Sequence, residues 1–198
     1  MAALMSLALA TLGSCTALAP QAENVTLYLL APELPHESSV ARHDIVIAVA
    51  PPQAWPGFDT EQIAYVRKPY ELDYFTASRW ADTPARMLAP LLARALERTG
   101  GFRAVVALLS TVGADYRLDT EILRLRQNFA VQPSRSELTL RAQLVDLRNR
   151  RVVASRVFEE TENAPSEDAF GGVVAANAAL QRALGKLAAF CVAEASAR

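Results

Sequence analysis

One segment of alternating apolar and polar residues, late in the chain, most constrains how the sequence can fold. Successive side chains of a β-strand point to opposite faces of the sheet, so an alternating pattern gives one apolar and one polar face. We therefore predict an antiparallel strand over Glu137–Asp146, with one face against a core and the other half exposed to water. Its apolar positions are Leu138, Leu140, Ala142 and Leu144, and its polar positions are Glu137, Thr139, Arg141 and Gln143.

The segments on either side of this strand have the same β character. Residues 116–130 and 151–160 predict two more long strands, so that three strands follow one another in series. In the first of them the apolar residues change parity, since Leu118 and Ile122 share one face and Leu123 and Leu125 the other. This change predicts a β-bulge near Ile122.

Two segments carry apolar residues at helical spacing. The first helix is expected to begin at Thr83 and Pro84 and to end at Gly100 and Gly101, because these residue types favour helix starts and ends. The second is expected over residues 166–195. Its apolar stripe comprises Val173, Ala176, Leu180, Leu184, Leu187 and Cys191.

Shorter strands are predicted at residues 25–30, 44–50, 62–66, 70–75 and 102–109. The strand at 44–50 is almost continuously apolar, which is typical of burial on both faces. With 198 residues, 52% of them apolar, the chain has enough material for one sizeable core. We predict an α/β domain in which two main helices pack on a mixed, largely antiparallel β-sheet.

The N-terminal segment has the pattern of an export signal. Residues 2–12 form an uncharged apolar run, too short for the roughly 20 residues that span a bilayer. Leu12, Gly13, Ser14 and Cys15 resemble a bacterial lipobox, in which a peptidase cuts before a lipidated cysteine. The resemblance implies a signal peptide at 1–14, a lipidated tether at 15–24 and a single domain at 25–198. The alternative is an ordinary cleaved signal peptide with a coincidental cysteine.

Charge and reactive residues exclude several function classes. Twenty basic side chains against 21 acidic ones leave no basic field for nucleic acid. The two histidines, His36 and His43, lack the spacing of a known metal site, and we find no motif for catalysis or for a cofactor. Cys191 is expected to be a buried small hydrophobe. The acidic residues Glu159, Glu160 and Glu162 are expected to be solvated charges on a strand edge.

An aromatic run stands out between Tyr65 and Trp80. One interpretation is that these rings seat the following helix on the sheet, because large aromatic side chains dominate core energetics. The other is that some of them form an exposed surface for a partner protein or a lipid. The candidate residues are Tyr70, Tyr74, Phe75 and Trp80.

This region resembles the central signature of a known family. Arg79-Trp80-Ala81, Thr83-Pro84, Met87-Leu88 and Gly101-Phe102 are similar to the ABC-type transport auxiliary lipoproteins, which include the paraquat-inducible outer-membrane lipoprotein. The resemblance implies a fold like the anticodon-binding-domain-like group and the amino-terminal domain of TolB.

The resemblance also implies a function. It predicts a non-enzymatic component on the periplasmic face of the outer membrane, consistent with Thr16 after the lipidated cysteine. Its partners would be an MCE-domain protein and an ABC permease and ATPase, which move phospholipids or other hydrophobic molecules between the two membranes. The alternative is an envelope assembly or structural lipoprotein that binds proteins or peptidoglycan. Oligomeric state stays open, since a homo-oligomeric ring would need a heterologous interface that closes.

Overall fold

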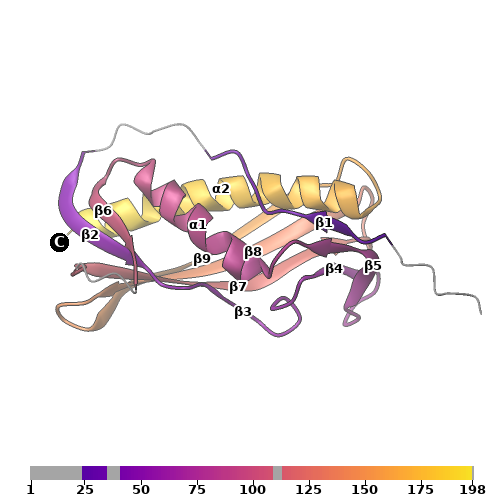
Figure 1. Ribbon diagram of the computed structural model, residues 1–198, viewed down its shortest axis with the longest axis horizontal. Coiled ribbons are helices and arrows are strands. Elements are labelled where there is room, and N and C mark those ends of the chain that lie inside the picture. The colour runs from indigo at the N-terminus through magenta and orange to yellow at the C-terminus, as the bar shows by residue number, and fades with distance from the viewer. Residues whose placement is uncertain (1–23, 35–40, 109–112, 198) are drawn as a thin grey trace, which may run out of the picture.

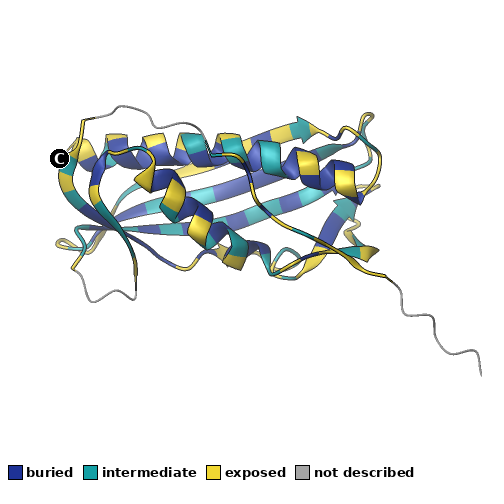
Figure 2. Cartoon of the chain, turned by 45° about the horizontal axis from the view of Figure 1, so that its top comes forward, coloured by how far each residue is buried: buried dark blue, intermediate teal, exposed yellow. Residues whose placement is uncertain are grey.

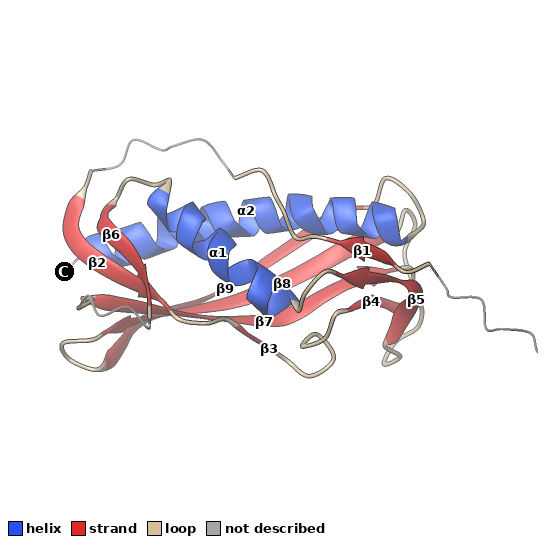
Figure 3. Cartoon of the chain, in the orientation of Figure 1, coloured by secondary structure: helices blue, strands red, loops and turns tan. Residues whose placement is uncertain are grey.

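The computed structural model describes residues 24–34, 41–108 and 113–197. Within them, nine strands form one mixed sheet and two helices lie against one face of it (Figures 1 and 3). The α/β prediction is confirmed, because the longest ladders are antiparallel and both helices pack on the sheet. The elements are β1 (Thr26–Tyr28), β2 (His43–Val49), β3 (Gln53–Ala54), β4 (Gln62–Val66), β5 (Asp73–Trp80), α1 (Pro84–Glu97), β6 (Phe102–Ala107), β7 (Tyr116–Asn128), β8 (Arg135–Asp146), β9 (Arg151–Asn163) and α2 (Ala169–Ser196).

The three long strands form an antiparallel meander. β7 pairs with β8 along its whole length, and β8 pairs with β9 in the same way. The β7–β8 register shifts between Ile122 and Arg124, which confirms the bulge that the parity change predicts. On the face toward α2, Leu118, Ile122 and Leu140 are almost completely buried.

The other edge of β7 is shared by three short parallel strands in succession. Residues 47–49 of β2 pair with 116–118, residues 53–54 of β3 with 121–122, and residues 65–66 of β4 with 127–128. β6 extends the sheet beyond β2, while β5 and β1 extend it beyond β4. On this edge of β7 the sheet divides into two branches, β2 with β6 and β4 with β5 and β1, and we call it forked. β7 is its central strand. β2, between β6 and β7, is buried from Val46 to Val49, as the apolar run predicts.

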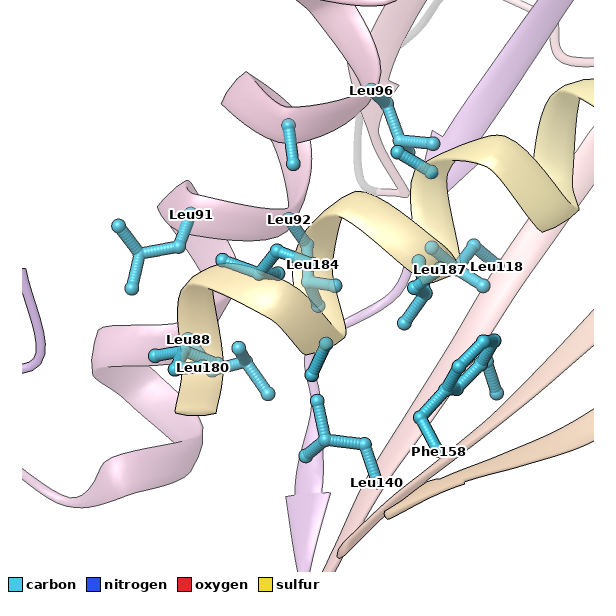
Figure 4. Close-up of a cluster of buried hydrophobic side chains, with 14 of the residues drawn as sticks. Leu88, Leu91, Leu92, Leu96, Leu118, Leu140, Phe158, Leu180, Leu184 and Leu187 are labelled. Carbon is cyan, nitrogen blue, oxygen red and sulfur yellow. The ribbon is translucent and has the colours of Figure 1, made fainter. Parts of the chain in front are cut away.

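The helices supply the apolar layer over the sheet. Figure 2 shows the buried residues of α2 facing the strands and its exposed residues facing outward, and every residue of the predicted α2 stripe is buried. Full burial of a leucine side chain contributes about 1.5–3 kcal/mol, so this layer is the main source of stability. Leu88, Leu92 and Leu96 of α1 meet Leu180, Leu184 and Leu187 of α2 above the sheet (Figure 4).

A glycine in the first turn allows α2 to begin close against the sheet. The Asp168 side chain caps the helix by accepting a hydrogen bond from the Gly171 N–H at 2.8 Å. A Cβ atom on Gly172 would lie 2.2 Å from Oε1 of Gln127, and the Gly172 carbonyl accepts a 2.6 Å hydrogen bond from Ser136 Oγ. Gly172 is therefore needed for the close approach of α2 to β7 and β8.

The strand predicted at residues 70–75 is wrong in position. The observed strand β5 begins at Asp73 and ends at Trp80. Tyr70 has a φ of 67°, a left-handed conformation that interrupts an extended chain, so the strand starts only after the turn.

The prediction that one face of Glu137–Asp146 is half exposed to water is also only partly correct. The strand begins at Arg135, and Glu137 and Thr139 on the polar face are buried. β8 lies between two long strands whose charged side chains cover its polar face. Separately, the short strand β3 lies between Pro52 and Pro56. Its chain is held to β7 by the Trp55 N–H, which donates to the Ile122 carbonyl at 2.9 Å.

Candidate functional site

The structure separates the four candidate aromatic residues. Trp80 is the last residue of β5 and only 3% exposed. Its backbone N–H donates to the Glu61 carbonyl at 2.7 Å, and Trp80 borders a void of about 10 Å³ together with Leu125 and Ala176. Trp80 thus lies between the sheet and α2, whereas the interpretation from the sequence concerned the helix that follows it, α1.

Phe75 belongs to a partly exposed aromatic cluster, which we define as Tyr65, Phe75, Phe129 and Arg67. The Phe75 ring lies 4.8 Å from Tyr65 and 6.2 Å from Phe129, and Tyr65 and Phe129 are 5.7 Å apart. The Arg67 guanidinium lies 5.1 Å from the Tyr65 ring and 5.7 Å from the Phe129 ring. Each ring pair contributes about 0.5–1.5 kcal/mol beyond its buried area, so the cluster joins β4, β5 and the end of β7.

Tyr74 and Tyr70 lie on either side of the start of β5 but differ in their surroundings. The Tyr74 hydroxyl donates to the Gly57 carbonyl at 3.1 Å, which ties the loop after β3 to β5. Gly57 has a φ of 92°, a conformation that glycine adopts readily. The Tyr70 side chain, in contrast, is fully exposed on the β4–β5 connection. Of the four candidates, only Tyr70 presents its whole side chain to solvent.

Sequence reasoning missed Phe129 as a member of the aromatic cluster. It follows β7 and lies far along the chain from Tyr65 and Phe75. The parallel pairing of residues 65–66 with 127–128 brings them together, and the Phe129 N–H donates to the Val66 carbonyl at 2.8 Å. The pairing of β4 with β7 is the signal that would have found it, and neither strand's own pattern reveals that pairing.

The remaining sequence candidates show no catalytic arrangement in the parts of the chain that the structure covers. Cys191 is completely buried, which confirms the prediction of a buried small hydrophobe, and burial raises the pKa of its thiol to about 12. His43 is the first residue of β2, while His36 lies outside the described residues. Among the described residues no three His, Cys, Asp or Glu side chains gather to hold a metal ion.

Several ion pairs lie on the outer face of the long strands, opposite the helices. Arg117 contacts Asp119 at 2.7 Å, Arg126 contacts Glu137 at 2.9 Å, and Arg141 contacts Glu121. Beside these pairs, a groove of about 490 Å³ lies between the β2–β3 segment and the start of β7. Acidic and basic side chains neutralise each other here, so the face is polar without a strong field of one sign.

Glu137 is the most buried member of this network. Burial alone would raise its pKa, but hydrogen bonds from Asn128 at 2.8 Å and Arg126 at 3.0 Å outweigh it. The pKa of Glu137 is therefore held below its ordinary value of 4.5. A carboxyl group of this kind stays ionised and does not donate a proton at neutral pH.

Glu160 corrects the prediction of a solvated acidic edge. It is only 7% exposed and binds α2 through Arg182 at 3.0 Å and Lys186 at 2.5 Å. Burial would raise its pKa, but the hydrogen bonds from Lys186 and Arg182 lower it below 4.5. Glu162 also contacts Arg182, at 2.7 Å, whereas Glu159 is exposed as expected. The acidic run thus fastens β9 to α2, because alternate residues of the strand point toward the helix.

The predicted lipidation site lies outside the described residues. Leu12, Gly13 and Ser14, with Cys15 after them, belong to the segment before residue 24. No helix in the described ranges combines the length and apolar character needed to cross a membrane.

Solved structures of other proteins share this architecture. Protein XCC0632 from Xanthomonas campestris, a DUF330 family protein, matches with 25% identity and a TM-score of 0.79, over 87% of this chain and 97% of that one. The hypothetical protein CT253 from Chlamydia trachomatis matches at 12% identity with a TM-score of 0.57, over 79% of this chain and 100% of its own, which shows a shared fold. Comparison with curated protein sequences gave no match.

A family model covers most of the chain. It describes the ABC-type transport auxiliary lipoprotein component and matches residues 28–189, from the end of β1 into the last turns of α2. The match therefore includes α1, strands β2 to β9, the aromatic cluster and α2 as far as residue 189. The chain belongs to the family of ABC-type transport auxiliary lipoprotein components.

Proposed function

We propose that this protein is a lipid-anchored periplasmic component of an ABC-type transport system that moves phospholipids or other hydrophobic molecules between the inner and outer membranes. The family match over residues 28–189 is the observation that carries the proposal. Its partners would be an MCE-domain protein and the ABC permease and ATPase. The anchor would be acyl chains on Cys15, held in the periplasmic face of the outer membrane.

The proposed boundaries follow from the same assignment. The signal peptide comprises residues 1–14, the lipidated tether 15–24, and the folded domain 25–198. The start of the domain is supported by β1, whose first residue is Thr26. Several acyl chains on one N-terminus give stable membrane attachment, whereas a single chain gives only marginal binding.

The proposal assigns no catalytic step to this chain. The thiol of Cys191 is buried with a raised pKa, and the buried carboxyls Glu137 and Glu160 are held ionised by basic partners. These groups serve packing and the attachment of strands to one another and to α2. ATP hydrolysis would then belong to the ATPase subunit, and this chain would act by binding.

Affinity purification from detergent-solubilised envelopes tests the proposal. The full-length chain should recover the permease, the ATPase and the MCE-domain protein together, and a strain that lacks the chain should show altered lipid exchange between its membranes. A Cys15→Ala chain in the same strain is the matched control, since it should fold normally but fail to restore exchange.

The alternative function gives a different result. Recovery of peptidoglycan or envelope proteins without any transporter subunit, together with normal lipid exchange in the deletion strain, would contradict a transport role. It would favour an envelope assembly or structural lipoprotein.

A further inference from the structure

Exposed apolar side chains gather at one end of the molecule. Among the described residues eleven large hydrophobic side chains are exposed, and seven of them belong to three segments: β1 and its flanks, the β4–β5 connection, and the first turns of α2. Figure 1 places these segments together at the end where the described chain begins, opposite the C-terminal end of α2. We call this set the apolar end: Val25, Leu27, Leu29, Tyr70, Leu72, Phe170 and Val174.

Sheet pairing brings the three segments to the same end. β1 runs parallel to β5, so the chain before Thr26 extends toward the start of β5 and the connection that carries Tyr70. That connection follows Val66, which pairs with Asn128 at the end of β7. The first turn of α2 packs against the neighbouring Gln127 through Gly172. The N-terminus of the domain, the turn and the helix start are therefore neighbours.

Direct contacts also join β1 to α2. Asn177 accepts a hydrogen bond from the Ala31 N–H at 2.7 Å and donates one to the Leu29 carbonyl at 3.2 Å. Val174 and Phe170 lie about one and two turns, respectively, before Asn177 on the same stripe of the helix. Leu29 is 59% exposed and Phe170 is 58% exposed, so apolar surface continues from the strand to the helix.

The tether restricts what can cover this surface. From Cys15 to Asn24 the chain has nine Cα-to-Cα steps and spans at most about 32 Å. Acyl chains on Cys15 would keep the first described residue, and the apolar end beside it, within that distance of the bilayer. Such tethering raises the effective concentration of the membrane at this surface, so even a weak contact becomes populated.

The chemistry of the apolar end also suits a membrane interface. Tyrosine is enriched at the boundary between acyl chains and headgroups, where its ring is buried and its hydroxyl stays wet. Lys68, near Tyr70 on the same turn, has a long stem that can lie along the apolar region while its charge stays in the headgroups. Lys68 also pairs with Glu71 at 3.5 Å. Because the two charges of this pair cancel, contact of the turn with a bilayer does not require anionic lipids.

From these observations we propose that the apolar end inserts into the interface of the bilayer that holds the lipidated Cys15. The inference rests on the lipid anchor of the proposed function. The contact orients the domain, because α2 and the long strands then extend away from the membrane (Figure 1). A phospholipid bilayer is the occupant to which the proposal commits.

Fluorescence quenching tests the contact with the full lipidated protein. A Tyr70→Trp variant adds a reporter at a fully exposed position, and the unsubstituted chain, in which Trp80 is buried and Trp55 is 47% exposed, supplies the background emission. In phosphatidylcholine vesicles with brominated acyl chains, we expect the added emission to be quenched several-fold more strongly than that of the unsubstituted chain. Flotation of the vesicles, measured in parallel, reports the anchor alone.

Matched substitutions assign the quenching to the apolar end. In the Tyr70→Trp chain, Leu27→Ser with Phe170→Ser should reduce it at least several-fold. Val152→Ser with Val157→Ser should leave it unchanged, because these residues of β9 are similarly exposed but lie outside the apolar end. All four substitutions are on the surface, so folding should be retained.

Three outcomes would overturn the proposal. A protein that floats with the vesicles but shows no extra quenching would have an anchor without the contact, and the proposed function would survive. A blue shift of the added emission that depends on protein concentration without vesicles would assign the surface to a second copy. A protein that never floats would overturn both the contact and the anchor.

Discussion

Two groups of apolar side chains in this protein face opposite environments. The leucines between α1, α2 and the long strands are buried on all sides, whereas the residues of the apolar end are largely exposed. Burial makes the first group the source of folding stability. The second group adds little to stability, and such a collection of exposed apolar residues marks a contact surface. The same residue types therefore serve the fold in one place and binding in another.

The largest expected effect on the free energy of unfolding comes from the core, and it is tested by replacing one residue of each group. Leu184→Ala removes a fully buried side chain and should lower the free energy of unfolding by about 2–5 kcal/mol. Leu27→Ala removes the same atoms from a position that is 62% exposed, and it should change the free energy by about 0.5 kcal/mol or less. Urea unfolding measures both. Similar losses in the free energy of unfolding from the two variants would contradict the distinction between the buried and the exposed group.

The next largest effect on the free energy of unfolding is expected at the start of α2. This helix contributes residues both to the buried core and to the apolar end. Gly172→Ala places a methyl group where Gln127 Oε1 lies, and we expect a loss of about 1–3 kcal/mol from overpacking. Gly113→Ala is the control, since a Cβ there meets no atom within 4 Å. Combining Gly172→Ala with Gln127→Ala should give less than the sum of the single losses. If the losses in the free energy of unfolding were strictly additive, contact between residue 172 and Gln127 would not be the cause of the loss in Gly172→Ala.

Acid should weaken the attachment of β9 to α2. The pKa of Glu160 is below 4.5 in the folded state, so the unfolded chain binds more protons and stability is lost as the pH falls through 4.5 and then through the folded value. Unfolding measured between pH 7 and pH 3 should show this decline, and Glu160→Gln should flatten it. The buried Glu137 contributes a decline of the same sign that persists in the variant. An unchanged slope in Glu160→Gln would contradict the role of this ion pair.

The smallest effect is expected on the outer face of the sheet. Arg141→Ala breaks a partly exposed ion pair with Glu121, and such pairs contribute about 0.2–1 kcal/mol. Addition of salt should reduce the difference between this variant and the unsubstituted chain. A loss as large as that of Leu184→Ala would mean that the outer face carries the fold as much as the helix face does.

Local patterns in the sequence predict the region that depends on local contacts. The meander, the bulge near Ile122 and the stripe of α2 follow from periodicity, because neighbouring segments of chain pair with each other there. The forked half depends on distant parallel pairings such as β3 with β7, and no periodicity within Gln53–Ala54 reveals that partner.

The candidate site was predictable to a smaller extent. The aromatic run identifies the correct region, but composition does not separate the buried Trp80 from the exposed Tyr70. That separation depends on the left-handed turn at Tyr70 and on the packing of Trp80 beneath α2. The burial of Glu160 likewise depends on Arg182 and Lys186, which lie on a helix that follows in the sequence and folds back over β9.

A lipid on Cys15 is the condition on which both proposals depend. Growth of cells that express the full chain in radioactive palmitate measures it directly. The chain should be labelled and recovered with the outer membrane, Cys15→Ala should carry no label, and Cys191→Ala should be labelled like the unsubstituted chain. An unlabelled chain, or one recovered free in the periplasm, would contradict the lipid anchor.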